Sequence, residues 1–330
     1  MQDDTARFQA LHERAYDAFD AGQLCEARDL FTSLIERDPT SPHYHYMLAL
    51  AHKYLRDWPA CLEHNLRSLE LRGAFDESSH WNAGIAATAL GDWAQARAQW
   101  EACGIALPPG EGPVEDDFGI VGIRLNPWSH GETLFARRVD VVRAQVLNVP
   151  LPESGLRCGD VVLHDGACTG QRDYGEQVVP VFNMLELLAR SPCATFTVFI
   201  ECPSPDDMGS LLALPRPGVV AIEDWTESVR HLCLRCSHGF PHTHERSTDA
   251  WDALRSLGMA AASRGDVEDL LDAWKSGSPG RRVESVQAQE DEPTSPADGV
   301  VWWRGPEDDD DGSGDGSSDF EGSGRPVPGT

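Results

Sequence analysis

The sequence lacks the features that define several large classes of protein. No apolar run approaches the roughly 18 residues that a membrane-spanning helix requires. The opening residues, Met1-Gln2-Asp3-Asp4, form neither the basic stretch nor the apolar core of a secretory signal. The chain also has no Gly-x-Ser-x-Gly, Gly-x-x-x-x-Gly-Lys or His-Glu-x-x-His motif, which mark hydrolase, nucleotide and zinc-peptidase sites. We therefore expect a soluble cytoplasmic protein without membrane contact. None of the three motifs is present to indicate an enzyme class.

A disulfide framework is lacking as well. The nine cysteines are an odd number and are scattered along 330 residues, unlike the closely spaced pairs of a small secreted domain. We expect most of them to be buried thiols in a reducing compartment.

Positive charge is scarce, and negative charge is unevenly placed. The net charge is −27, and residues 284–330 hold thirteen acidic side chains against two arginines, so this segment alone supplies eleven of the net negative charges. We expect no direct nucleic-acid binding, and the charge favours a basic protein as partner.

A repeated pattern organises the first third of the chain. Two apolar helical segments flank a short polar break three times, and the breaks contain Gly22, Arg56 and Gly91, which are 34 and 35 residues apart. In the first and third units, alanine, an aromatic residue and proline follow the glycine at offsets of 5, 9 and 17 residues: Ala27, Phe31 and Pro39, then Ala96, Trp100 and Pro108. The middle unit has Cys61, Asn65 and Gly73 at these offsets, although its Asp57-Trp58 matches Asp92-Trp93.

Residues 8–109 resemble the tetratricopeptide (TPR) family on this period and these offsets. The resemblance implies an array of helical hairpins over residues 1–110, with a concave groove that takes a segment of another protein. The resemblance gives these candidates for partner binding: His12, Tyr16, Phe19, His43, Tyr46, Lys53, Trp81 and Ile85. The remaining groove positions are Gln9, Leu50, Ser78 and Thr88. The alternative is that this face packs against the chain's own second domain.

After a proline- and glycine-rich linker at residues 108–113, the pattern changes to short β-favouring runs. The expected strands are Gly119–Leu125, Arg138–Val149, Asp160–His164, Thr195–Glu201 and Val219–Ile222. Val179–Ala189 and Pro205–Leu214 fit helices. Residues 114–230 are therefore expected to form an α/β or α+β domain with a mixed sheet.

A polar stretch in this domain raises the alternative of an enzyme. We expect a loop at His164–Glu176 that follows a buried strand, and loops at strand ends often carry functional groups. Its candidate catalytic residues are His164, Asp165, Arg172 and Glu176, with the repeats recruiting a substrate. The alternative for His164-Asp165-Gly166 is an ordinary turn, with the aspartate capping backbone amides and the glycine at positive φ.

A cysteine and histidine cluster is the densest chemical signal. Cys233 and Cys236 have the C-x-x-C spacing of a zinc site, and His242 and His244, with His238 as a substitute, complete four tetrahedral ligands. Only five residues separate the two ligand pairs, which makes a short loop for a zinc site. The sequence therefore allows either a structural zinc or a loop without metal.

The last third is expected to contain two helices and then a disordered tail. The two helices are Ala250–Ser263 and Val267–Trp274, and Asp266 caps the second. They complete a region at residues 231–276. Residues 277–330 are rich in Gly, Ser, Pro and acids and predict disorder. An apolar island at Val300–Trp303 can dock on the body or on a partner.

The sequence thus predicts a helical array joined to an α/β domain, and it favours a protein-binding module over an enzyme. The roles that fit this architecture and charge are those of an adaptor, a chaperone, or an immunity protein that neutralises a basic toxin. We expect a composite binding surface in which Tyr16, Tyr46 and Trp81 act with loops of the second domain.

Overall fold

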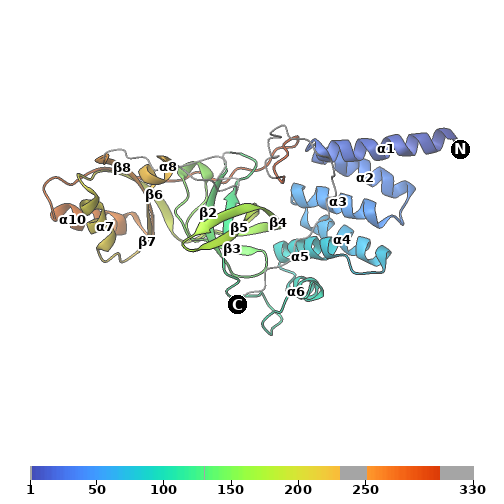
Figure 1. Ribbon diagram of the computed structural model, residues 1–330, viewed down its shortest axis with the longest axis horizontal. Helices are drawn as coiled ribbons and strands as arrows, with labels where there is room; N and C mark the ends of the chain where they lie inside the picture. Colours follow the sequence, from blue (N-terminus) through green and yellow to red (C-terminus); the bar gives the residue numbers. More distant parts are fainter. Residues whose placement is uncertain (1, 130, 231–250, 305–330) are drawn as a thin grey trace.

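The computed structural model describes residues 2–129, 131–230 and 251–304. Figure 1 shows an elongated molecule with a helical array at one end, a β-barrel in the middle and a helix-covered sheet at the other end. The predicted combination of a helical array with mixed α and β structure is confirmed. Within the described ranges, no helix combines the length and the apolarity needed to cross a membrane.

Three helical hairpins form the array, as the repeat period predicts. The helices are α1 (Gln2–Asp20), α2 (Leu24–Arg37), α3 (Pro42–Leu55), α4 (Trp58–Arg72), α5 (Glu77–Leu90) and α6 (Trp93–Ala102). The three breaks turn the chain at Gly22, Arg56 and Gly91, with φ of 72°, 62° and 69°. Arg56 therefore adopts the left-handed conformation that glycine supplies in the other two units.

The Asp-Trp pairs of the second and third units have a structural explanation. The carboxylates of Asp57 and Asp92 accept hydrogen bonds from the backbone N–H groups three residues on, which caps α4 and α6. The tryptophans that follow contact the barrel: Trp58 Nε1 donates to Glu186 Oε2, and the guanidinium of Arg143 lies 4.8 Å from the centre of the Trp93 ring. The repeated pair thus joins each helix start to the second domain.

Five strands form the closed barrel, and one of the predicted elements changes type. They are β1 (Ile120–Leu125), β2 (Glu132–Arg138), β3 (Arg143–Val146), β4 (Val161–Tyr174) and β5 (Gln177–Ala189), in that order, with β5 parallel to β1. The helix expected at Val179–Ala189 is wrong, because β5 pairs with both β4 and β1. Strand β2 was not among the predicted strands.

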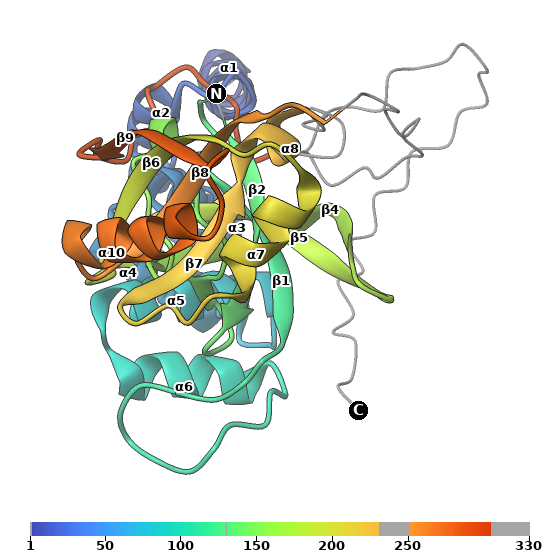
Figure 2. The same ribbon diagram turned by 90° about the vertical axis from the view of Figure 1, so that its left-hand side faces the viewer.

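A four-stranded sheet with helices on one face completes the fold. Its elements are β6 (Ala194–Glu201), α7 (Pro205–Ala213), β7 (Val219–Asp224), α8 (Trp225–Arg230), β8 (Leu254–Ala261), α10 (Arg264–Ser276) and β9 (Arg282–Ala288). The strand order β7-β8-β6-β9 is antiparallel throughout, the order of a split βαβ fold. Figure 2 shows α7 and α10 lying in front of this sheet.

Two predictions for this region need correction. The helix expected at Ala250–Ser263 is wrong, because Leu254–Ala261 form the central strand β8, paired on both sides. The following helix is confirmed as α10, but its cap is Ser263, whose side chain accepts from the N–H of Asp266.

The expected disorder of residues 277–330 is wrong for residues 277–304. β9 pairs with β6, and residues 289–304, which we call the strap, run back along the barrel to the array (Figure 1). Trp302 and Trp303 at its end are 2% and 8% exposed. Burying such side chains contributes about 1.5–3 kcal/mol each, which offsets the entropy of ordering this polar segment. Residues 305–330 lie outside the described residues.

Candidate functional site

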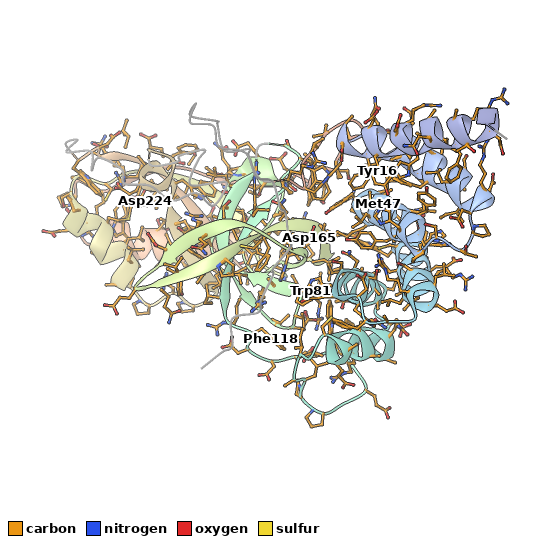
Figure 3. All side chains as sticks on the ribbon, turned by 45° about the vertical axis from the view of Figure 1, so that its right-hand side comes forward. Tyr16, Met47, Trp81, Phe118, Asp165 and Asp224 are labelled. Atoms are coloured by element: carbon orange, nitrogen blue, oxygen red, sulfur yellow. The ribbon has the colours of Figure 1, made fainter. Side chains whose placement is uncertain are left out.

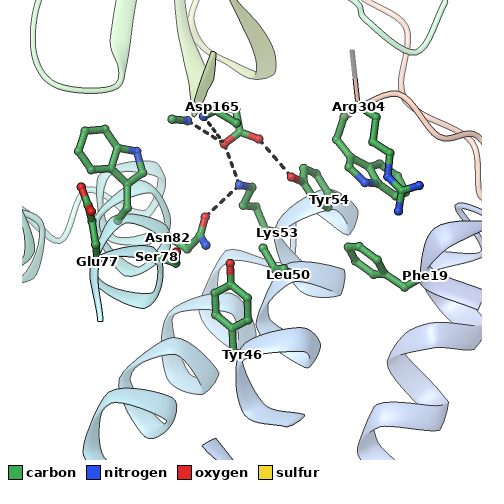
Figure 4. Close-up of a pocket in the computed structure, with 14 residues that line it drawn as sticks. Phe19, Tyr46, Leu50, Lys53, Tyr54, Glu77, Ser78, Asn82, Asp165 and Arg304 are labelled. Atoms are coloured by element: carbon green, nitrogen blue, oxygen red, sulfur yellow. Dashed lines mark hydrogen bonds and ion pairs between the residues drawn. The ribbon is translucent and has the colours of Figure 1, made fainter. Parts of the chain in front are cut away.

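A hollow of the described surface lies where the array, the barrel and the strap meet. It is a cavity of about 500 Å³, which we call the composite cavity, and Figure 4 shows its lining. The lining residues are Phe19, Tyr46, Leu50, Lys53, Tyr54, Glu77, Ser78, Trp81, Asn82, Asp165, Gly166, Ala167, Trp303 and Arg304. Side chains far apart in the sequence therefore form one site.

The first helices of the second and third hairpins supply most of this lining. On α3, Tyr46, Leu50 and Lys53 follow at spacings of four and three residues, which places them on one face of the helix. On α5, Trp81 and Asn82 stand one turn after Ser78. The lining thus combines aromatic rings with charged and polar groups (Figure 4).

A buried ion pair forms the polar floor of the cavity. Lys53 Nζ lies 2.8 Å from Asp165 Oδ1 and 2.9 Å from Asn82 Oδ1, and Tyr54 donates its hydroxyl to Asp165 Oδ2 at 3.3 Å. Burial alone would lower the pKa of the Lys53 ammonium, but the charge of Asp165 outweighs it and raises that pKa. The pKa of the Tyr54 hydroxyl is raised, by burial first and then by Asp165. Lys53 is therefore a charged anchor for the barrel.

A bulge in β4 directs Asp165 toward the helices. The pairing of β4 with β5 shifts register between His164 and Cys168, and such bulges re-aim side chains. Figure 3 shows Asp165 on the side of the barrel that faces the array, close to Trp81. A Cβ added to Gly166 would lie 1.8 Å from Trp81 Nε1. The glycine is therefore needed for space, whereas the turn interpretation gave it a positive φ.

The candidate catalytic residues do not converge. Residues 164–174 belong to the strand β4 instead of a loop, so Asp165 and Arg172 are separated by about 23 Å of strand at ~3.3 Å per residue. His164 stacks on Phe182, and its burial lowers its pKa to about 4. Arg172 donates to the carbonyl of Thr133. Glu176 is exposed. These four side chains therefore do not form one acid–base group.

The eight predicted partner-binding residues divide into three sets. Phe19, Tyr46, Lys53 and Trp81 line the composite cavity. His12, Tyr16 and His43 form a separate aromatic group of α1 and α3, with the Tyr16 ring 4.6 Å from His12 and 5.8 Å from His43. Ile85 is fully buried in the core cluster that the array shares with barrel residues such as Leu163 and Leu185, so its placement on an open groove surface is wrong.

The repeat register did not supply Tyr54 and Glu77 on the helices, residues 165–167 of β4, or the strap residues Trp303 and Arg304. Tyr54 lies one position beyond the expected face of α3, and Asp165 was considered as a catalytic group or as a turn cap. The apolar island at Val300–Trp303 was a visible signal for the strap, but its docking place was not.

The expected zinc ligands Cys233, Cys236, His242 and His244, with His238, lie outside the described residues. Elsewhere in the chain, the described side chains form no group of three or more His, Cys, Asp or Glu residues that could hold a metal ion. The zinc site stays a prediction.

Comparison with known proteins returned limited similarity. The sequence matches no family model, and no curated protein matches it. Among solved structures, the chain is similar to the first TPR domain of Spaghetti (RPAP3) bound to an HSP90 peptide, with 22% identity and a TM-score of 0.27 over 29% of this chain and 75% of that chain. It is also similar to the TPR2B domain of yeast Sti1 in a complex with pHsp70, with 18% identity and a TM-score of 0.28 over 29% of this chain and 77% of that chain.

Proposed function

We propose that this chain is a protein-binding module that holds a segment of another protein in the composite cavity. One observation carries the proposal: an extended segment of the chain itself, the end of the strap, already lies against the cavity and forms one of its walls through Trp303 and Arg304. The site thus has the shape and the chemistry to accommodate a peptide.

The lining supports this occupant. Tyr46 and Trp81 offer rings to apolar side chains of a partner, while Glu77 and Ser78 offer hydrogen-bond acceptors at the same edge. Protein interfaces favour this mixture of aromatic anchors and polar groups. Lys53 and Asp165 are already paired and serve to fix the walls.

The net charge of −27 suggests that the partner is basic, because opposite charge accelerates encounter. Among binding roles, an adaptor, a chaperone and an immunity protein that occludes a basic toxin fit this charge and architecture equally.

The test is to compare the proteins retained by the wild-type chain with those retained by Tyr46→Ala. Tyr46 lines the cavity, whereas Tyr174 at the β4–β5 hairpin is exposed, so Tyr174→Ala is the matched control. We expect a partner that is lost with Tyr46→Ala, kept with Tyr174→Ala and weakened by salt above about 0.1 M. Equal retention by both variants would contradict the proposal.

A further inference from the structure

The last seven residues of the strap, 298–304, which we call the docked segment, cross the turn between α1 and α2. The N–H of Gly299 donates to the carbonyl of Gly22 at 2.7 Å, and the N–H of Cys25 donates to Asp298 Oδ1 at 3.1 Å. At the other end, Arg304 forms an ion pair with Asp20 of α1. The segment is therefore held at both ends by polar contacts with the first hairpin.

The two tryptophans of the docked segment fill an aromatic site between the array and the barrel. The ring of Trp303 stacks on Tyr54 at 4.7 Å with an interplanar angle of 15°, and lies 5.4 Å from Phe19. Trp302 packs edge-on against Tyr54 at 5.3 Å and Trp128 at 5.2 Å. This arrangement is that of a bound peptide with two aromatic anchors.

The fit of the docked segment is incomplete. Trp302 Nε1 and Asn183 Oδ1 are buried, and neither finds a hydrogen-bond partner among the described residues. A buried polar atom without a partner weakens the state that contains it. Val300 and Val301 remain 37% and 40% exposed, and the strap residues that lead to them, 289–297, form neither helix nor strand. The backbone N–H of Gln289 donates to the carbonyl of Thr195 on β6, but the docked segment itself belongs to no strand, so it can leave without breaking one.

We propose that the docked segment is a displaceable intramolecular ligand, and that the partner enters with an extended segment of its own that carries a tryptophan followed by a basic residue. The inference rests on the proposed function, because it names the partner segment and the group that the partner must replace. The tryptophan takes the site on Tyr54 and Phe19, and the basic residue takes the place of Arg304 at Asp20. The attached segment competes because its tether gives it a high effective concentration.

The test uses the chain's own sequence as the probe. A fluorescent peptide of residues 296–304 is titrated into the full-length chain and into the full-length double variant Trp302→Ala/Trp303→Ala, with fluorescence anisotropy as the readout. We expect the peptide to bind the double variant at least about tenfold more tightly than the wild type, whose site is filled. Equal affinity for both proteins, or no binding to the double variant when its circular dichroism shows it folded, would overturn the proposal.

A matched pair of glycine variants locates the binding site. In the double-variant background, Gly22→Ala places a Cβ 2.8 Å from the position of the Val300 backbone, whereas Gly73→Ala, at a similar φ, meets nothing within 4 Å. Both changes strain the backbone in the same way, but Gly22→Ala alone should abolish peptide binding. Retained binding with Gly22→Ala would show that the peptide docks elsewhere, which contradicts the proposal.

A second variant covers the case in which the double tryptophan variant does not fold. Asp298→Ala/Arg304→Ala keeps both indoles and removes the two polar anchors, so the peptide should bind it about threefold more tightly than the wild type. Affinity equal to that of the wild type would overturn the inference. If the peptide fails in these titrations while Tyr46→Ala still loses a captured protein, this inference falls and the proposed function stands.

Discussion

Lys53 Nζ on α3 and Asp165 Oδ1 on β4 lie 2.8 Å apart although 112 positions separate the two residues in the sequence. Both side chains are nearly inaccessible, with 4% and 5% exposed. A charge buried to this degree is tolerated when its counter-charge and hydrogen-bond partners stay in place. This ion pair therefore fixes the barrel at one distance from the array and sets the depth of the composite cavity.

Removing one charge of this pair should destabilise the protein strongly. Lys53→Met leaves the Asp165 carboxylate buried without its cation, and we expect a loss of about 3–5 kcal/mol in the free energy of unfolding, measured in urea. The double variant Lys53→Met/Asp165→Asn should recover part of the loss. The asparagine oxygen can still accept from the Gly166 N–H, and the amide NH2 in place of the second carboxylate oxygen can donate to the Tyr54 hydroxyl.

The exposed pair Arg264–Glu268, on α10 with both side chains about half exposed, is the control. It is broken by Glu268→Gln, because Arg264 also donates to the carbonyl of Val286, and the change should cost less than about 0.5 kcal/mol. A Lys53→Met variant as stable as Glu268→Gln would show that the buried pair does not join the two parts.

Gly166 should not tolerate a side chain. Gly166→Ala places a methyl group 1.8 Å from Trp81 Nε1, so the bulge or the indole must move, at a cost of about 1–3 kcal/mol in thermal or urea unfolding. Gly209→Ala on α7 is the matched control, because a Cβ there meets nothing within 4 Å and helix propensity favours alanine by up to about 1 kcal/mol. Equal stability of the two variants would mean that β4 and α5 are not in this close contact.

The helical array was predictable because its information is local. The period of 34 and 35 residues and the Asp-Trp pairs specify turns and caps without reference to the rest of the chain. The same register placed Phe19, Tyr46, Lys53 and Trp81 on the groove, and all four line the composite cavity. Ile85 was misplaced because the local register does not show that this part of α5 is buried in a core shared with the barrel.

The two false helices, at Val179–Ala189 and Ala250–Ser263, share a physical cause. Strand β5 spans the first stretch and β8 (Leu254–Ala261) lies within the second, and each has hydrogen-bonded neighbours on two sides. Such strands lose the alternation of apolar and polar residues, and a short apolar run then fits a helix equally well. Tertiary pairing, which no local pattern records, decided between the two structures.

The centre of the site depended on long-range contacts and could not be read from the sequence. Asp165 reaches Lys53 only because a bulge in β4 turns it toward the array. Trp303 was visible as part of an apolar island, but nothing in residues 300–303 names Tyr54 as its partner. The sequence therefore identified the groove and left open what covers it.

Acid should destabilise the array through its histidines. His64 lies between His45, at 3.0 Å between their Nδ1 atoms, and the stacked ring of His52. Burial first, and then the charges of His45 and His52, lower its pKa to about 4. The unfolded chain therefore binds the proton more readily, so this stability is complete above about pH 6.5 and is lost as the pH falls toward 4.

The expected loss at about pH 5 is on the order of 1 kcal/mol, allowing for solvent screening at a half-buried group. His64→Asn should reduce the difference between unfolding free energies in urea at about pH 7 and about pH 5. His12→Asn, on α1 and outside this group, should leave the difference unchanged. If His64→Asn keeps the whole difference, the acid sensitivity comes from elsewhere, with the buried His164 the first alternative.

The contact of Trp58 with Glu186 should matter more than the related contact of Trp93. Trp58→Phe keeps an aromatic ring but removes the N–H that donates to the Glu186 carboxylate, which should cost about 1.5–3 kcal/mol. Trp93→Phe keeps a ring beside the Arg143 guanidinium, 4.8 Å from the present ring centre, and should cost less than about 1 kcal/mol. Urea unfolding of the two full-length variants measures the difference. Equal losses from both substitutions would show that the indole hydrogen bond does not hold α4 on the barrel.

Because α4 packs directly on α3, which lines the cavity, Trp58→Phe should also weaken binding of the 296–304 peptide in the Trp302→Ala/Trp303→Ala background.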